Sequence, residues 1–250
     1  MQKLDLYIGG GDPKVTRELV DAVKTPAADG RWYPIAHGRL LSQVDATLRR
    51  AGLEVVNEAH CLSREGERYF GLLQVMDLRR VDEDYSLVIG LRNSHDKSIV
   101  AGLAVGAGVH VCSNLSFSSD IRIDRKHTRH VDRDLPTLIS SAIGQLGDAR
   151  RSQDRRISTY KGQELTAAQA HDLVVQAFDQ RIVPVTQIPR VLAEWRAPSH
   201  PEFAKSRNVW RLFNAFTETL KGSSLFQRPV ATQALHGLMD TACGIALSSN

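Results

Sequence analysis

The sequence predicts an α+β protein in which a curved antiparallel sheet is backed by helices and followed by a helical C-terminal part. Apolar residues recur at helical spacing near the N-terminus and through the second half of the chain. Between these regions lie several short segments with strand-like alternation, separated only by turns. Strands joined by short turns pair antiparallel, and 42% hydrophobic residues suffice for a sizeable core.

A short helix is expected just after Gly9-Gly10-Gly11. Asp12 is a favourable N-cap and Pro13 is favourable at the first helical position. The apolar stripe of this helix would be Val15, Leu19 and Val23. Residues 24–37, which contain prolines and a glycine, are expected to form a loop.

A second helix is predicted over residues 39–51, where leucine and valine recur at helical spacing and Gly52 provides a stop. Strands are then predicted over residues 53–61 and 67–77, and residues 64–67 are predicted to form the hairpin turn between them. The next strand, residues 85–92, alternates Leu87, Ile89 and Leu91 with Val88, Gly90 and Arg92.

The segment 101–112 is the most informative strand. Its valines and Leu103 share one face, whereas the other face carries three glycines, His110 and Cys112. One face therefore belongs to the core, and the other is nearly bare backbone. A last strand passes through Ile121 and Ile123.

Helices dominate the rest of the chain. An apolar stripe over 135–146 predicts a long helix, and the arginine-rich segment 150–162 lacks periodicity and is interpreted as a linker. Thr166 and Gln169 have capping-box spacing, and a further helix carries Val209, Leu212, Phe213, Phe216 and Leu220.

These patterns divide the chain into four parts. Residues 1–37 form an N-terminal helix and loop, and residues 38–149 form the α+β core. A basic linker over 150–163 precedes a helical part over 164–250 that packs on the core.

Cysteine usage and hydropathy indicate in which compartment of the cell the protein is expected. Three cysteines form an odd, sparse set, and no apolar run approaches the roughly 20 residues of a membrane-spanning helix. A cytoplasmic protein without a membrane partner is expected. The formal charge of +4 favours an anionic partner only if the basic residues share one face.

The run from Val88 to Ser98, with Asn93-Ser94-His95-Asp96 at its centre, and the later run Val111-Cys112-Ser113-Asn114 resemble the phage/plasmid-like domain-of-unknown-function family 932. Residues 121–128 and 208–214 are similar to further stretches of that family. Lys97 stands where glycine is usual in the family. The resemblance implies a shared fold and a mobile-element context.

The motif Asn93-Ser94-His95-Asp96 is interpreted first as a turn, because asparagine, serine and aspartate bond their own backbone in turns. The alternative is an acid/base role for His95, Asp96 and His127. A metal site at His95, His110, Cys112 and His127 is a further alternative, since thiolate and imidazole are zinc ligands. A buried cysteine and hydrogen-bonded histidines explain the same residues without metal, so no cofactor is expected.

Basic residues crowd two neighbouring segments, which suggests phosphate binding. The candidates are Arg122, Arg125, Lys126, Arg129, Arg150 and Arg151. A solvated, salt-bridged surface is the simpler interpretation. Aromatic residues for base stacking are scarce nearby, where only Phe117 and Tyr160 occur.

The leading hypothesis is a non-catalytic nucleic-acid-binding protein of a phage or plasmid. The order of elements looks like the sheet-and-helix core of single-strand annealing proteins, which suggests a homo-oligomer acting in recombination on DNA, and single-stranded DNA in particular. A metal-dependent nuclease or phosphoesterase is one alternative. A protein-binding module that counters host defence is another.

Overall fold

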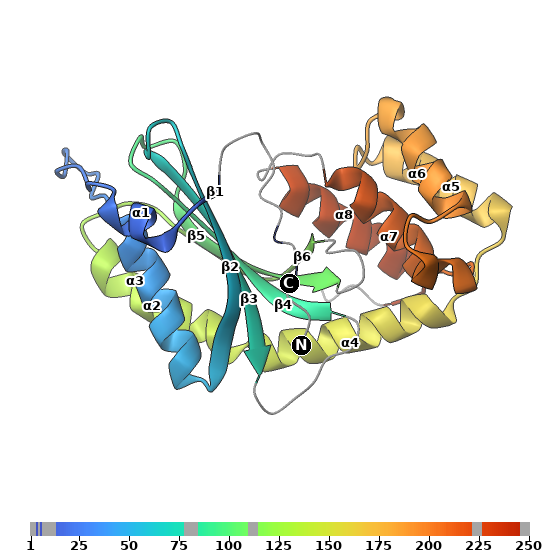
Figure 1. Ribbon diagram of the computed structural model, residues 1–250, viewed down its shortest axis with the longest axis horizontal. Helices are drawn as coiled ribbons and strands as arrows, with labels where there is room; N and C mark the ends of the chain where they lie inside the picture. The colour runs from blue at the N-terminus through green and yellow to red at the C-terminus, as the bar shows by residue number, and fades with distance from the viewer. Residues whose placement is uncertain are drawn as a thin grey trace.

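The computed structural model describes Leu4, Leu6 and residues 14–77, 85–109, 115–221 and 227–245, with backbone alone at 108–109, 115–120 and 227–229. Its centre is a six-stranded sheet in which each strand pairs antiparallel with the next along the chain (Figure 1). The strands are β1 (Lys14–Val15), β2 (Leu53–Ser63), β3 (Arg68–Asp77), β4 (Tyr85–Ser94), β5 (Ala101–Val109) and β6 (Leu115–Arg125). The predicted α+β class is confirmed.

Helices lie on both sides of this sheet. Figure 1 shows α1 to α3 on one side, α5 to α8 on the other, and the long α4 passing below and joining the two groups. The helices are α1 (Arg17–Ala22), α2 (His37–Arg50), α3 (Val131–Gly144), α4 (Leu146–Gly162), α5 (Ala167–Asp179), α6 (Ile188–Arg196), α7 (Val209–Leu220) and α8 (Gln227–Ala242). Two short 3-10 helices, Val185–Gln187 and Pro201–Lys205, precede α6 and α7.

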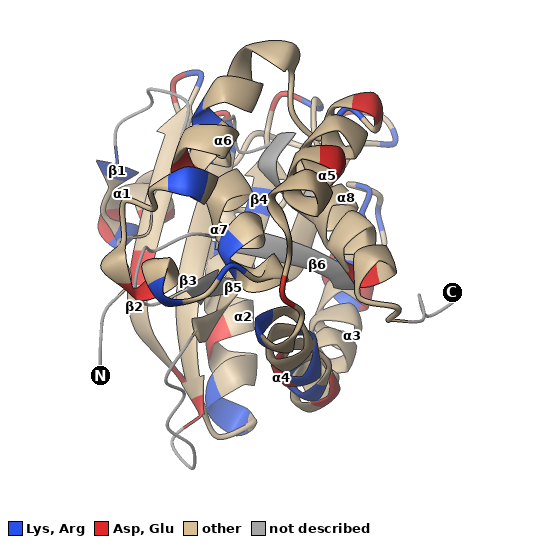
Figure 2. Cartoon of the chain, turned by 90° about the vertical axis from the view of Figure 1, so that its right-hand side faces the viewer, with Lys and Arg blue, Asp and Glu red and all other residues tan. Residues whose placement is uncertain are grey.

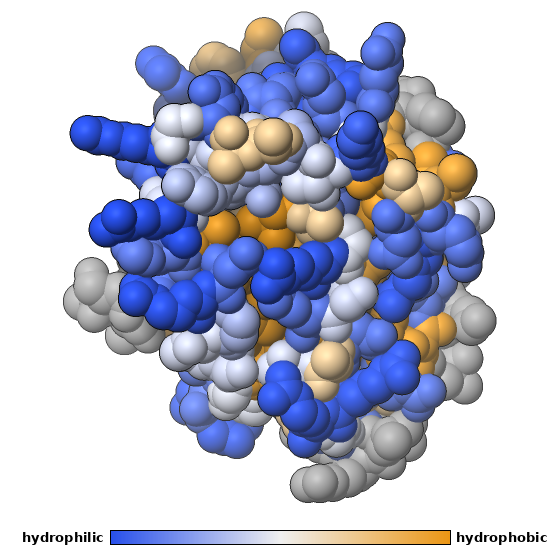
Figure 3. All heavy atoms as spheres, turned by 90° about the vertical axis from the view of Figure 1, so that its left-hand side faces the viewer, coloured by the Kyte–Doolittle hydropathy of each residue, from blue (hydrophilic) through white to orange (hydrophobic). Residues whose placement is uncertain are grey.

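The main core extends from the contact of one face of the sheet with α2 and α3 to the helices α4 to α8. The alternation expected in β4 is confirmed, because Leu87, Ile89 and Leu91 are all buried in this core. The apolar stripe of α2 packs there as well, and it consists of Leu40, Leu41, Val44 and Leu48. Figure 3 shows the outward side over these helices as mainly hydrophilic, as expected for amphipathic helices.

The opposite face of the sheet carries a smaller apolar cluster. Leu72 and Val88 lie at its centre, and Leu4 and Leu6 from the N-terminal segment cover them. The main-chain N–H of Leu4 donates to Gln74 Oε1 at 3.0 Å. Both faces of the central strands are therefore covered at this point, and the N-terminal segment contributes to the core.

The hairpin turn expected at residues 64–67 is confirmed. Arg64, Glu65 and Gly66 have φ angles of 50°, 56° and 88°. Consecutive residues in the left-handed region reverse the chain with the twist that two adjacent antiparallel strands require. The short turn sets the register of β2 against β3.

The helix predicted to start after Asp12 is placed wrongly. Asp12 and Pro13 lie outside the described residues, but Lys14 and Val15 are extended and pair with β2. The helix begins only at Arg17, after Thr16 in an extended conformation. Pairing with the edge of the sheet outweighs the local preference for helix, and Leu19, expected in the stripe, is 54% exposed.

The linker expected over residues 150–162 is also wrong, because this segment continues α4. The buried residues of α4 recur at helical spacing, but Arg150 and Gln153 are among them. Because two positions of the buried stripe hold polar residues, the apolar residues of this segment do not recur at helical spacing in the sequence. The division of the chain into separate parts at these points stays a prediction.

A buried polar cluster fastens α4 to α8. Arg156 Nε lies 3.0 Å from Asp240 Oδ1, with exposed side-chain fractions of 13% and 4%. The Tyr160 hydroxyl donates to the same carboxylate oxygen at 2.6 Å. Burial and the neighbouring Asp240 carboxylate both raise the pKa of Tyr160 far above its ordinary value, which keeps the phenol a donor.

Replacing Asp240 by asparagine is expected to lower the free energy of unfolding by about 3 kcal/mol, because the Arg156 guanidinium then loses its buried contact with the Asp240 carboxylate. Urea denaturation measures this loss. The matched control is Asp148→Asn on the exposed face of α4, where the pair with Arg151 is solvated and the expected change is below about 0.5 kcal/mol. Equal losses of unfolding free energy in the two variants would contradict a stabilising role for the buried contact between Arg156 and Asp240.

Candidate nucleic-acid interface

The family-like motif forms the turn that ends β4, as expected. The Ser94 hydroxyl donates to the Ile99 carbonyl at 2.8 Å and accepts from the Ile99 N–H at 3.1 Å. Asp96 accepts from the Ser98 N–H at 3.0 Å and is paired with Arg68 at 2.6 Å. These side-chain bonds replace the ladder bonds that β4 loses at its end.

Asn93, the first residue of the motif, points into the interior and connects three distant segments. Its Nδ2 donates to the Ile35 carbonyl at 2.8 Å and to His37 Nδ1 at 2.9 Å. Its Oδ1 accepts from His127 Nε2 at 2.7 Å. Both ends of this fully buried amide are therefore bonded, as a buried polar group requires.

These bonds assign the tautomers of the surrounding imidazoles. Because the Asn93 Nδ2 can only donate, His37 Nδ1 is the acceptor, and His37 carries its proton on Nε2. That Nε2–H donates to the Gly66 carbonyl at 2.9 Å. His95 donates from Nε2 to the Ile35 carbonyl at 2.9 Å and stacks on His37 with ring centroids 3.9 Å apart.

The environment favours the neutral form of the His37 and His127 rings. Burial, followed by the proximity of His95, lowers the pKa of His37 from 6.5 to about 4. The same two causes lower the pKa of His127. Burial opposes ionisation of Asp96, but the hydrogen bonds from Ser98 and Arg68 outweigh it and lower the pKa of Asp96 to about 2.

The fold thus brings His95 and His127 close together, with His37 as an unexpected third ring. His37 and His95 donate their Nε2–H groups to carbonyl oxygens, and His127 donates its Nε2–H to Asn93 Oδ1. The Asp96 carboxylate is paired with Arg68. Within the described part of the chain, no group of three His, Cys, Asp or Glu residues is arranged to hold a metal ion. His110, Cys112 and Asn114 lie outside that part. The metal site predicted at His95, His110, Cys112 and His127 therefore stays a prediction.

A cavity of about 470 Å³ lies beside this cluster. Three loops form it, namely residues 29–32, 97–100 and 126–128. The main-chain N–H of Tyr33 donates to the His127 carbonyl at 3.1 Å, which holds the first loop against the third. The lining side chains are Asp29, Arg31, Trp32, Lys97, Ser98, Ile99, Val100, Lys126, His127 and Thr128.

Lys97 enters this pocket from a strained position. Its φ angle is 64°, in the left-handed region that favours glycine, which accounts for the glycine usual here in the family that the sequence resembles. Its Nζ lies 2.5 Å from Asp29 Oδ2 and 5.2 Å from the centroid of the Trp32 ring. An ion pair and a cation–π contact thus hold the lysine across the pocket.

The other cations of the pocket differ from Lys97 in having no counter-ion in the part of the chain that the structure describes. Arg31 and Lys126 are exposed, and neither forms an ion pair within the residues that the structure describes. Arg129, three positions beyond Lys126, is exposed and donates to His130 Nε2 at 2.9 Å. Among the described residues that line the pocket, the cations of Arg31, Lys97 and Lys126 thus face one carboxylate, that of Asp29.

Arg122 lies on the sheet in a salt-bridged patch, which matches the simpler interpretation of the basic segment. Its guanidinium is 2.8 Å from Asp124, which also binds Arg92 at 2.6 Å. A Cβ added to Gly102 would lie 2.8 Å from Asp124 Oδ1. The bare face of β5 is therefore filled at this point by the protein's own ion pairs.

Three further candidates are neutralised or buried. Arg125 lies 2.5 Å from Asp134, and Arg151 pairs with Asp148. Arg150 is only 5% exposed, so its side chain cannot reach a phosphate from its observed position. Figure 2, which views α4 nearly along its axis, shows both basic and acidic residues on this helix. Lys126 and Arg129 remain the predicted residues best placed to meet an anion.

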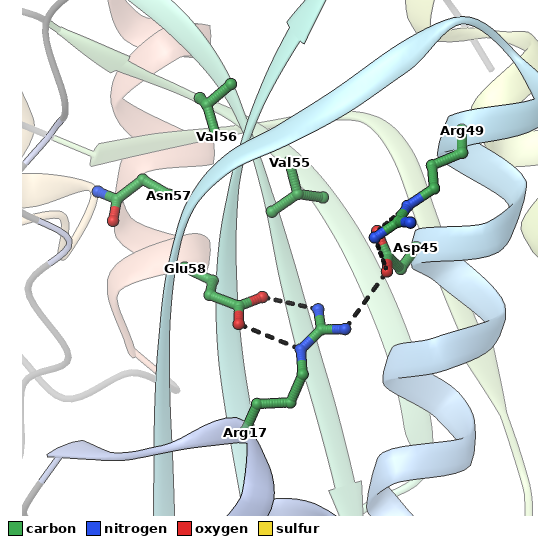
Figure 4. A pocket seen from close by; sticks show the side chains of 7 residues that line it. All are labelled: Arg17, Asp45, Arg49, Val55, Val56, Asn57 and Glu58. Atoms are coloured by element: carbon green, nitrogen blue, oxygen red, sulfur yellow. Dashed lines mark hydrogen bonds and ion pairs between the residues drawn. The ribbon is translucent and has the colours of Figure 1, made fainter.

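A second pocket, of about 490 Å³, lies between α2 and the β-bulge at residues 55–57 of β2 (Figure 4). Arg17 bridges Glu58 at 2.7 Å and Asp45 at 3.3 Å, and Arg49 binds Asp45 at 3.0 Å. The two guanidinium groups of this second pocket are therefore balanced by two carboxylates. It therefore attracts a polyanion less than the pocket beside His127.

A family model described as Domain of unknown function (DUF932) matches residues 27–238, most of the chain. The chain belongs to the DUF932 family. The matched residues include the Asn93 cluster and every residue that lines the pocket beside His127. No curated protein and no solved structure matches this DUF932 chain. None of the helices in its described residues combines the length and apolarity needed to cross a bilayer.

Sequence reasoning did not select Lys97 as a binding residue of this DUF932 chain, and it missed the pocket residues Arg31 and Trp32. Both lie in a loop about 65 positions before Lys97 and show no periodic pattern. The two aromatics expected near the basic segment are not the relevant ones, because Tyr160 is fully buried and the Phe117 side chain lies outside the described residues. Only tertiary contacts place an indole beside Lys126.

Acidification is expected to destabilise the protein through His37. Its pKa is lower in the folded chain than in the unfolded one, so the unfolded state binds more protons as the pH falls from about 6.5 towards 4. His37 alone should then reduce the free energy of unfolding by about 3 kcal/mol. Urea denaturation across this pH range measures the slope.

The variant His37→Gln keeps one donor and one acceptor but does not titrate, so its stability should depend less steeply on pH. The control is His171→Gln on α5, where the side chain is exposed in the folded chain as in the unfolded one. If the wild type and His37→Gln have the same slope, His37 is not the acid-sensitive group.

Proposed function

We propose that this protein binds nucleic acid without catalysing a reaction, through basic side chains around the pocket beside His127. The observation that carries the proposal is that Arg31, Lys97 and Lys126 line one cavity together with Trp32. The first two come from segments far apart in the sequence, so the fold itself concentrates this charge. Phosphate contacts from such side chains supply most non-specific affinity for nucleic acid.

The balance of charge in the two pockets supports this location. The pocket near the β-bulge has equal numbers of guanidinium and carboxylate groups, whereas the pocket beside His127 has an excess of cations. Arg129 extends this positive surface beyond Lys126. A phosphate backbone that crosses the pocket would thus contact cations that lack carboxylate partners among the described residues.

The chemistry of the neighbouring motif supports a role without catalysis. A general base must be reachable by a substrate, but His37, His95 and His127 are all buried. Both ring nitrogens of His37 are also bonded within the structure. Asp96 is held as a paired carboxylate by Arg68. The motif is thus interpreted as the support of the binding surface.

The wider role that we propose is strand annealing or recombination in a phage or plasmid context, by a homo-oligomer. It rests on the order of helices and strands, which is an analogy at the level of fold. Light scattering tests the oligomer, and a fluorescence-transfer assay of complementary strands tests annealing.

The test of binding is a fluorescence-anisotropy titration of labelled single- and double-stranded DNA at several salt concentrations. The wild type is expected to bind with an affinity that falls steeply with salt. In the variant Arg31→Ala, Lys126→Ala, Arg129→Ala, affinity should fall more than tenfold. Its salt dependence should be shallower by about 0.7 for each lost contact to single-stranded phosphate.

The matched control removes three exposed basic residues elsewhere, with Arg190→Ala in α6, Lys205→Ala in the following 3-10 helix and Arg207→Ala just after it. It should retain nearly all of the affinity, which shows that position matters and not net charge alone. Absence of DNA binding at low salt would overturn the proposal and favour the protein-binding alternative.

A further inference from the structure

Trp32 is the feature of the pocket that phosphate binding leaves unexplained. Its side chain is partly exposed and lines the cavity, unlike the buried Trp195 and Trp210. Its Nε1–H is buried and has no hydrogen-bond partner among the described residues. The His127 ring lies 6.2 Å away at an angle of 51°, so the two rings line the cavity without stacking on each other.

The cations lie around the same indole. Lys97 Nζ is 5.2 Å from the centroid of the ring, and Arg31 and Lys126 line the same cavity. A ligand that combines a flat ring with an anionic group could contact the indole and these cations together. The cavity of about 470 Å³ lies within the usual range of small-ligand sites.

The backbone at Lys97 gives independent support. A lysine with φ of 64° is disfavoured relative to glycine, and such strain concentrates at binding sites. The ion pair with Asp29 is an exposed one, with exposed side-chain fractions of 52% and 73%, so it adds little stability of its own. The strained backbone at Lys97 therefore serves to place the ammonium group over the pocket.

We propose that this pocket holds one unpaired nucleotide, with its base against Trp32 and its phosphate between Lys97, Lys126 and Arg31. The inference rests on the proposed function and makes it specific for single strands. A base within a duplex is paired and stacked, so it must be flipped out before it can enter a pocket. Stacking on an aromatic side chain is available to any base, so no strong sequence preference is expected.

The first experiment compares Trp32→Ala with Tyr33→Ala in anisotropy titrations of a labelled oligothymidylate and a labelled duplex. Tyr33 is the adjacent aromatic residue, is 39% exposed and does not line the pocket. Trp32→Ala is expected to lose about tenfold or more in affinity for the single strand and little for the duplex, whereas Tyr33→Ala keeps both affinities.

The second variant, Lys97→Gly, separates binding from folding. Glycine relieves the strain at φ of 64°, so the thermal midpoint should stay equal or rise. The loss of the ammonium should nevertheless weaken single-strand binding several-fold. A Lys97→Gly protein that is stable and binds as tightly as the wild type would overturn the role of Lys97.

Competition by small ligands identifies the chemistry that the pocket recognises. Thymidine monophosphate should displace the oligothymidylate and quench the fluorescence of Trp32, and the quenching should be absent in Trp32→Phe. Inorganic phosphate at the same concentration should compete far less. Equal competition by the two ligands would overturn the contact with the base.

The outcomes separate this inference from the proposed function. Without DNA binding at low salt, the proposed function fails. If DNA binds but Trp32→Ala has no effect and duplex competes as well as single strand, only the nucleotide pocket fails. If the wild type prefers single strands and Trp32→Ala loses this preference, the result supports both the proposed function and the nucleotide pocket.

Discussion

The interaction on which the rest depends is the buried amide of Asn93. Its three hydrogen bonds reach the loop at Ile35, the start of α2 at His37 and the segment after β6 at His127. His37 extends the connection to the β2–β3 hairpin through the Gly66 carbonyl. In a dry interior an unmet polar group is costly, so each of these segments is held in one position relative to the end of β4.

This network decides the shape of the surface outside it. The pocket is built from the loop before α2, the turn after β4 and the segment after β6. Two of these segments contribute directly to the Asn93 cluster, and the third follows the motif itself. The histidines therefore act through position, and the exposed cations and the indole are the groups that a ligand can meet.

The second half of the chain is attached by a different kind of contact. The helix α4 carries the chain from the core to the C-terminal helices, and its buried face combines apolar residues with Arg150 and Gln153. The carboxylate of Asp240 on α8 gathers Arg156 and Tyr160 from α4 into one buried cluster. Charges are buried here only because they are paired, which fixes how α8 lies against α4.

The sequence by itself determined the class of fold, most strands, the hairpin turn, α2, α3, α7 and the family, because these depend on local periodicity and short motifs. It misplaced the N-terminal helix, where Lys14 and Val15 pair with the sheet edge, and it missed α4, whose buried stripe contains polar residues. Only the tertiary structure decided which basic residues are free of carboxylates and which aromatic lies beside them. Trp32 and Lys126 are far apart along the chain, and their proximity depends on long-range hydrogen bonds that no local pattern records.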